Sequence, residues 1–105
     1  MAIANSKNNA SIRLTDERWQ HITVGHPEVA DYYYEILETI EQSETIYEGK
    51  SGEFIAIKEF DKTSPKFVVV IYKEIDKIDG FIITAFISKR RQEFNKKKVI
   101  WKLKN

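Results

Sequence analysis

The first half of the chain has a helical pattern of apolar and polar positions. Thr15 suits the N-cap of a helix over residues 16–24, because its hydroxyl can accept a hydrogen bond from an unpaired N–H of the first turn. Gly25 is a typical residue at a helix end, and Pro27 suits the first position of a second helix that begins with Glu28. We therefore predict two helices that nearly abut.

The second predicted helix is amphipathic. Its apolar positions recur at helical spacing, and its acidic positions form the opposite face. The apolar positions are Val29, Tyr33, Ile36, Leu37 and Ile40. A base-stacking role for residues 32–34, three consecutive tyrosines, is the less favoured interpretation, because consecutive residues of a helix point in different directions. We expect these tyrosines to pack in the core and at its rim.

After residue 44 the pattern changes to short runs rich in β-branched and aromatic residues. Turn residues interrupt these runs at residues 49–52, 61–65 and 76–80. The four predicted strands cover residues 45–49, 53–60, 66–75 and 80–88. Connections this short join antiparallel strands. Residues 99–103 are a candidate fifth strand, whereas the lysine-rich residues before them favour a loop.

Helices followed by strands predict an α+β domain, with two N-terminal helices packed on one face of a four- to five-stranded antiparallel meander sheet. The two longest strands are almost continuously apolar, so the second face of the sheet also needs cover. That cover would come from the N-terminal residues, the C-terminal segment or a bound partner. We expect residues 1–11 to be a flexible polar leader and residues 12–105 to form a single domain.

Composition narrows the classes of protein. The 105 residues include no Cys, which excludes disulfides, thiolate zinc sites and a Cys nucleophile and makes the cytoplasm the default location. No apolar run approaches the roughly 20 residues of a membrane-spanning helix, so we expect a soluble protein without a membrane partner. Motifs for phosphate-binding loops, dinucleotide sites and α/β-hydrolases are missing, and we expect no cofactor.

Charge is separated along the chain although the net charge is only +1. Residues 28–61 contain ten acidic and two basic side chains, whereas residues 89–105 contain eight basic and one acidic. The basic segment would follow a phosphate backbone while the acidic segment repels it. The candidate RNA-binding residues are Arg90, Arg91, Lys96, Lys97 and Lys98. A solvated tail that only maintains solubility explains the same charges about as well.

Few side chains can transfer protons near neutral pH. The two histidines, His21 and His26, are five residues apart, a spacing that points them in different directions on a continuous helix and does not favour a shared metal site. His26 precedes Pro27, where a structural role suffices, so His21 is the better catalytic candidate. We expect one histidine to be buried and structural.

The strands offer cations and hydroxyls. Lys58 and Lys73 interrupt apolar runs, and Thr84 and Ser88 share one face of a strand. Each residue alone is explained by ordinary strand chemistry. Together, a histidine, a cation and a hydroxyl would suit attack of a ribose 2′-OH on the neighbouring phosphate, which needs a proton acceptor, a proton donor and positive charge, but no metal. Arg90 would reach the same phosphate.

The run RWQHITVGHPE, followed by FVVVIYKE and GFIITAFISKR, resembles phage-associated members of the barnase, EndoU, colicin and RelE-like nuclease superfamily. The resemblance covers roughly residues 13–101. It implies a metal-independent, toxin-like ribonuclease, with RNA as substrate and an antitoxin or immunity protein as a possible partner. It also implies a site containing His21, Lys58 or Lys73, and Thr84, with Arg90 in support. A relative that only binds RNA or protein, without catalysis, would share these motifs.

Overall fold

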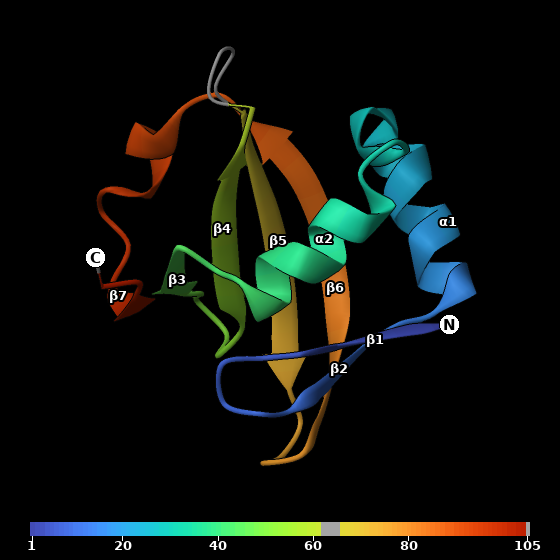
Figure 1. Cartoon of the computed structure of the whole chain (residues 1–105), viewed down its shortest axis with the longest axis horizontal. Coiled ribbons are helices and arrows are strands. Elements are labelled where there is room, and N and C mark those ends of the chain that lie inside the picture. Colours follow the sequence, from blue (N-terminus) through green and yellow to red (C-terminus); the bar gives the residue numbers. More distant parts are fainter. Residues whose placement is uncertain (62–65, 105) are drawn as a thin grey trace.

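The computed structural model of the protein describes residues 1–61 and 66–104. These contain two α-helices, two short 3₁₀ helices and seven strands (Figure 1). In chain order they are β1 (Ala2–Asn5), β2 (Ser11–Leu14), α1 (Asp16–Gly25), η1 (Pro27–Val29), α2 (Tyr33–Glu41), β3 (Thr45–Glu48), β4 (Phe54–Phe60), β5 (Lys66–Glu74), β6 (Asp79–Ser88), η2 (Arg91–Phe94) and β7 (Val99–Lys102). None of the described helices is long and apolar enough to cross a membrane.

All the strands join one mixed sheet in the order β1-β2-β6-β5-β4-β3-β7. Strands β3 to β6 form the predicted antiparallel meander, and β7 confirms the candidate fifth strand. However, β2 pairs parallel with β6, so the prediction of a four- to five-stranded antiparallel sheet is wrong. The predicted break at residues 61–65 lies outside the described residues except for Asp61.

The sequence analysis missed two strands, β1 within the expected leader and β2 at its end. Residues 1–11 hold β1, the turn and the first residue of β2, so strands precede the helices in this chain. Ala4, Ile12 and Leu14 alternate with outward-facing residues and are at most 1 % exposed. The sequence analysis missed these strands because their buried positions are few and the polar residues between them form a hairpin turn. In that turn Asn9 has a positive φ of 64°, which asparagine tolerates better than most residues.

The helical segment follows the prediction at its start but not at its centre. Thr15 caps α1 by accepting a hydrogen bond from the Arg18 N–H at 3.1 Å, as predicted. The expected second helix is instead split into η1 and α2, because Tyr32 leaves helical geometry and its N–H bonds the Val29 carbonyl at 2.8 Å. This tight turn leads the chain from the end of α1 onto the sheet.

Helix α2 lies across one face of the sheet (Figure 1). The residues on this face alternate along each strand with residues of the other face, and they bury the larger core together with α2. Ile36 and Ile40 of α2 pack there with Val68, Val70 and Tyr72 of β5. Of the three consecutive tyrosines, Tyr32 and Tyr33 pack against this core and Tyr34 is 78 % exposed.

The second face is covered over only part of its area. Phe94 of η2 is 4 % exposed and packs on Tyr47, Ile55, Ile57 and Val69, so the C-terminal segment supplies part of the cover that the apolar strands require. Side chains farther along β5 and β6 are half-buried or exposed. We call this uncovered part the open face, and its residues are Ile71, Lys73, Phe81, Thr84 and Phe86.

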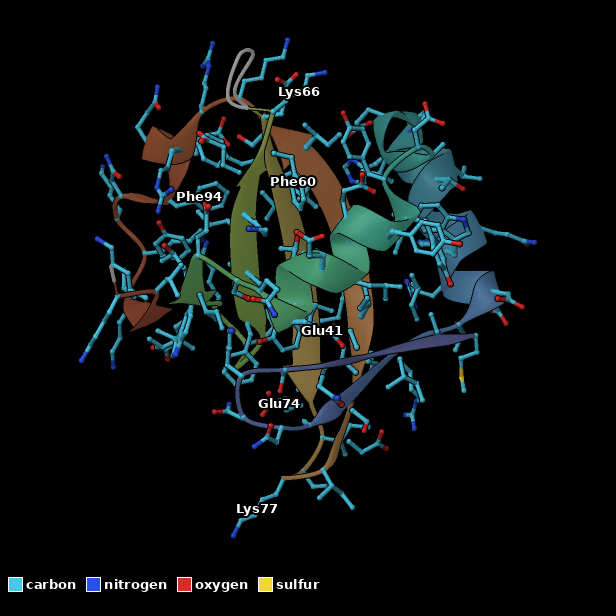
Figure 2. The ribbon with its side chains drawn as sticks, viewed as in Figure 1. Glu41, Phe60, Lys66, Glu74, Lys77 and Phe94 are labelled. Atoms are coloured by element: carbon cyan, nitrogen blue, oxygen red, sulfur yellow. The ribbon has the colours of Figure 1, made fainter. Side chains whose placement is uncertain are left out.

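Two carboxylates hold the β1–β2 turn against the domain (Figure 2). Glu41 of α2 accepts a hydrogen bond from the Asn5 N–H at 3.0 Å. Glu74, at the end of β5, accepts from the Ser6 hydroxyl at 2.7 Å and from the Asn8 side-chain amide at 3.2 Å. Because Ser6 is 4 % exposed, its bond to a charged acceptor is the stronger of these anchors.

We predict that Glu74→Ala lowers the free energy of unfolding by about 1 to 2 kcal/mol, because it removes a charged acceptor from a buried hydroxyl. Urea unfolding followed by circular dichroism measures the change. Glu38→Ala is the matched control, because Glu38 is an exposed acid on α2. Equal midpoints for the two variants would show that Glu74 does not anchor the hairpin.

Tyr72 makes the free energy of unfolding depend on pH in the alkaline range. Burial raises the pKa of the Tyr72 phenol above its ordinary value, and the negative charge of Glu74 raises it further. In the unfolded chain a tyrosine ionises near pH ~10. The neutral phenol therefore contributes stability that is fully present below that pH and is lost as the pH rises above it.

We expect the wild type to lose more stability between pH ~9 and ~11 than Tyr72→Phe, because phenylalanine cannot ionise. Urea midpoints measured across this range test the difference. Tyr34→Phe, which removes an exposed phenol, is the control. Parallel stability curves for the wild type and Tyr72→Phe would contradict the assignment.

Candidate functional site

The candidate site lies along the edge of β6. Strand β2 pairs with β6 only at residues 79–81, and α1 begins two residues after β2 ends. Ile71 pairs with Thr84 and Tyr72 pairs with Ile82, so Ile83 is an extra residue that bulges β6. The Ile83 carbonyl accepts a hydrogen bond from the Arg18 guanidinium at 3.4 Å. Helix α1 therefore takes the place of a strand beside the second half of β6.

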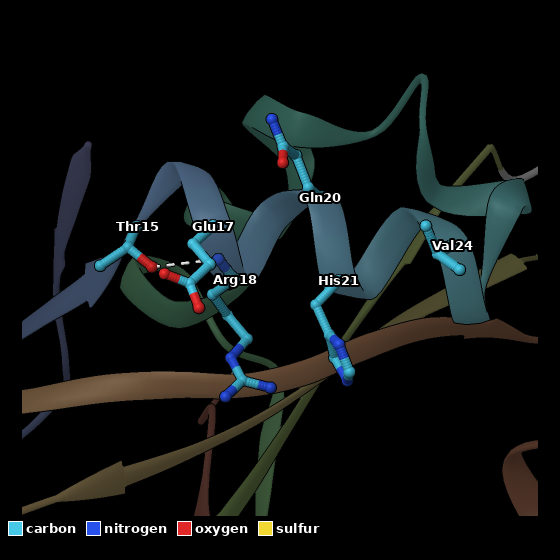
Figure 3. A pocket seen from close by; sticks show the side chains of 6 residues that line it. All are labelled: Thr15, Glu17, Arg18, Gln20, His21 and Val24. Atoms are coloured by element: carbon cyan, nitrogen blue, oxygen red, sulfur yellow. Dashed lines mark hydrogen bonds between the residues drawn. The ribbon is translucent and has the colours of Figure 1, made fainter.

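Both histidines belong to this edge. Arg18 contacts Ile83 near the start of α1, and His26 contacts Phe86 just beyond its end. The stretch of α1 between them, which includes His21, therefore runs beside residues 83–86 of β6. His21 and Arg18 are one turn apart and project in the same direction from the helix (Figure 3). They help to line a hollow of about 490 Å³ along α1.

His26 is held on both sides. Its Nδ1 lies 3.4 Å from Oε2 of Glu28, and its ring centroid lies 5.7 Å from that of Phe86. The contact with Glu28 engages Nδ1 of the ring and not Nε2. The His26 side chain is 41 % exposed, and His21 is also exposed. The expectation of one buried histidine is therefore wrong.

Thr84 and Lys73 lie on the open face with Phe86, against which His26 rests. Thr84 pairs with Ile71 on β5, and Lys73 is two residues farther along β5 on the same face. This spacing corresponds to about 7 Å along the strand. A histidine, a hydroxyl and a cation are thus brought to one face of the sheet.

Lys58, Ser88 and Arg91 do not join this group. Lys58 pairs with Val68, which belongs to the core beneath α2, so Lys58 lies on the opposite face, where its Nζ is 5.5 Å from the ring centroid of Phe60. The sequence analysis could not exclude Lys58 from the site, because a lysine that interrupts an apolar run can point to either face of the sheet. The Ser88 hydroxyl accepts a hydrogen bond from the Arg90 N–H at 3.1 Å.

Arg91 stabilises the fold. Its guanidinium donates to the Thr45 hydroxyl at 2.9 Å, lies 4.0 Å from Glu44 and sits 5.6 Å from the ring centroid of Phe67. These contacts attach η2, and with it Phe94, to β3 and β5. Arg90, by contrast, is exposed beyond the end of β6.

The three consecutive lysines are remote from the histidines. Lys96, Lys97 and Lys98 line a hollow of about 400 Å³ with residues 48–50 and Glu93. Lys98 lies 3.8 Å from Glu48 of β3. Because β5, β4 and β3 separate β6 from β7, this basic group lies at the other end of the sheet.

Arg18, Phe81 and Phe86 were not recognised as site residues in the sequence. Arg18 is one turn before His21, and this spacing is a signal for a shared face of a helix. Phe81 and Phe86 have different parity in the sequence, which predicts opposite faces of a strand. The bulge at Ile83 brings both rings to the same face, and no local pattern marks it.

The arrangement supplies groups for proton transfer and for binding an anion. Imidazole side chains such as those of His21 and His26 can transfer protons, the Thr84 hydroxyl can donate a hydrogen bond, and Arg18 and Lys73 carry positive charge. Among the described residues there is no cluster of three or more His, Cys, Asp or Glu side chains able to hold a metal ion.

Comparisons with known proteins give no match: no family model matches the chain, and neither the curated proteins nor the solved structures contain a match.

We predict that Arg91→Ala lowers the free energy of unfolding by about 1 kcal/mol, because it removes a hydrogen bond, an ion pair and a ring contact. Arg90→Ala, its exposed neighbour, should change stability by less than about 0.5 kcal/mol. Thermal unfolding of the two variants makes a matched comparison, in which 1 kcal/mol corresponds to a shift of about 4 to 8 °C. Equal melting temperatures would contradict the role of Arg91.

Proposed function

We propose that the protein is a metal-independent endoribonuclease that acts in the cytoplasm. The observation that carries this proposal is the placement of His26, Thr84 and Lys73 on one open face, with His21 and Arg18 along its edge. These are the groups that cleavage through the ribose 2′-OH requires, namely a proton acceptor, a proton donor and positive charge. The resemblance to the barnase, EndoU, colicin and RelE-like nucleases agrees with this chemistry.

The reaction is a transesterification. The 2′-oxygen attacks the adjacent phosphorus, and Nε2 of His26 takes the 2′-OH proton. The bond between phosphorus and the 5′-oxygen breaks, and His21 gives a proton to that leaving oxygen. The products are a 2′,3′-cyclic phosphate and a 5′-hydroxyl. Glu28 orients the His26 ring through the 3.4 Å contact with its Nδ1.

Negative charge on the phosphate increases in the transition state, and the cations of the site stabilise that charge. Lys73 is exposed on the open face, and Arg18 keeps N–H groups beyond the one that it donates to Ile83. The Thr84 hydroxyl donates to a phosphate oxygen and orients it. Arg90 makes an outer contact with the RNA backbone. In this mechanism Lys58 has no role, because it lies on the other face.

We expect the purified protein to cleave single-stranded RNA in the presence of EDTA and to leave cyclic phosphate ends. His26→Ala and His21→Ala should each lower kcat by about 100-fold or more, because they remove proton transfer. Thr84→Val, which keeps the shape of the side chain but not the hydroxyl, should lower kcat by about 10-fold or more. Gel analysis of an end-labelled RNA measures all three.

Lys58→Ala is the control for Lys73→Ala, because it removes a lysine from the opposite face of the same sheet. Activity should fall only in the Lys73 variant. Absence of cleavage by the wild type, or undiminished cleavage when both histidines are replaced, would overturn the proposal. RNA binding with a steep salt dependence but without turnover would instead identify a non-catalytic binding module.

A further inference from the structure

We propose that Phe81 forms a base-stacking subsite beside the cleaved phosphate, so that the substrate is RNA with an unpaired base at that position. This inference rests on the proposed function, since it assigns the substrate class of the same open face. The subsite consists of the Phe81 ring with Lys73 on one side and Arg13 on the other.

Phe81 lies between two cationic residues of neighbouring strands. It pairs with Lys73 of β5 and with Arg13 of β2, so all three side chains leave the sheet on the same face. Arg13 is fixed by an ion pair with Asp79 at 2.9 Å, and it forms a side wall of the subsite. Lys73 is exposed and available to a phosphate. The Phe81 ring itself is half-buried, which fixes its position and leaves part of its surface accessible.

The distance to the reaction centre suits one nucleotide. Phe81 is opposite Lys73 and Thr84 is opposite Ile71, so the two positions are about 7 Å apart along the sheet. A phosphate at Thr84 therefore places the neighbouring base over Phe81. Stacking on an aromatic ring accepts any base, because every base has a flat π face.

The distribution of charge favours RNA over a protein partner. Lys73 and Arg18 add positive charge on or beside the open face, where Arg13 is neutralised by its ion pair with Asp79, whereas the acidic residues of α2 are on the opposite side of the sheet. A strand of RNA is thus attracted to one face and repelled by the other. Ile3, 53 % exposed, also leaves the sheet on the side of the open face, so a second copy of the chain is the competing occupant that the experiment must exclude.

A paired base cannot use this subsite. In a duplex the flat surfaces of the bases are covered by their neighbours, so a base must leave the stack before it can lie on Phe81. Single strands, loops and bulges are therefore the substrates that the subsite accepts.

The first experiment measures binding without cleavage. A fluorescent single-stranded oligonucleotide with 2′-O-methyl riboses is titrated with protein, and the same sequence annealed to its complement is the comparison. We expect Phe81→Leu to raise the Kd for the single strand roughly tenfold, and Phe81→Trp to keep it near the wild-type value. Phe60→Leu, on the opposite face, should leave it unchanged. The duplex should bind all four proteins alike.

The second experiment fixes the register. A DNA oligonucleotide with one ribonucleotide has a single cleavable phosphate. In one variant the nucleotide on the 5′ side of this phosphate lacks its base, and in the other the nucleotide on the 3′ side lacks its base. Phe81→Leu should lower kcat/KM roughly tenfold on the intact strand, and it should have almost no effect on one of the two abasic strands. That strand identifies the side on which the base stacks.

The outcomes separate the two proposals. If no strand is cleaved but Phe81→Leu still weakens single-strand binding, the catalytic proposal fails and the subsite stands. Suppose that cleavage depends on the histidines, but Phe81→Leu has the kcat/KM of the wild type or lowers kcat/KM equally on the intact strand and both abasic strands. The subsite is then refuted and the enzyme stands. Sedimentation showing a dimer that Phe81→Leu dissociates, together with unchanged RNA binding, would assign the face to a second copy and also refute the subsite.

Discussion

The parallel pairing of β2 with the first residues of β6 is the constraint on which the rest of the structure depends. It covers residues 79–81 of β6 and then ends, because β2 is only four residues long. The chain turns at Thr15 and continues as α1 along the remainder of the same edge. The helix rather than another strand therefore meets the bulge at Ile83, and His26 meets Phe86 as a result.

The two faces of the sheet have different roles because one is largely covered by the chain and the other is covered only in part. Helix α2 covers one face along β4 and β5, and its outer side carries the acidic residues. On the other face, Phe94 covers the strands near β3, and Arg91 fixes the segment that carries it. The remaining area is open, and His26, at the junction of α1 and η1, borders it through its contact with Phe86. In the proposed enzyme, RNA completes the cover that the chain itself leaves unfinished.

The sequence predicts the meander well because its strands are rich in β-branched and aromatic residues and are bounded by turn residues. It predicts α1 and its Thr15 cap for a similar reason, since capping is a local interaction between near neighbours. The β1–β2 hairpin was missed because its buried positions are small or few and polar residues lie between them. Its pairing with β6 is a contact between the two ends of the chain, which no local pattern encodes.

The same limits apply to the candidate site. The two histidines were chosen as candidates because the chain contains no others, and Thr84 was chosen because it shares a strand face with Ser88, so both choices stay predictions. The face on which Lys58 lies and the contacts of Arg91 depend on register, which is fixed by the pairing of whole strands. The joint placement of Phe81 and Phe86 depends on one extra residue in β6, so it required three-dimensional coordinates.

The pairing of Ser11 with Asp79 also determines when the fold can be completed during synthesis. A ribosome delivers the N-terminal hairpin first, but the strand that receives it appears only after most of the chain has been made. Until then Ala4, Ile12 and Leu14 have no sheet to pack against. Helix α1 also cannot reach its place beside β6, so a nascent chain would hold both histidines without bringing them to the edge of β6.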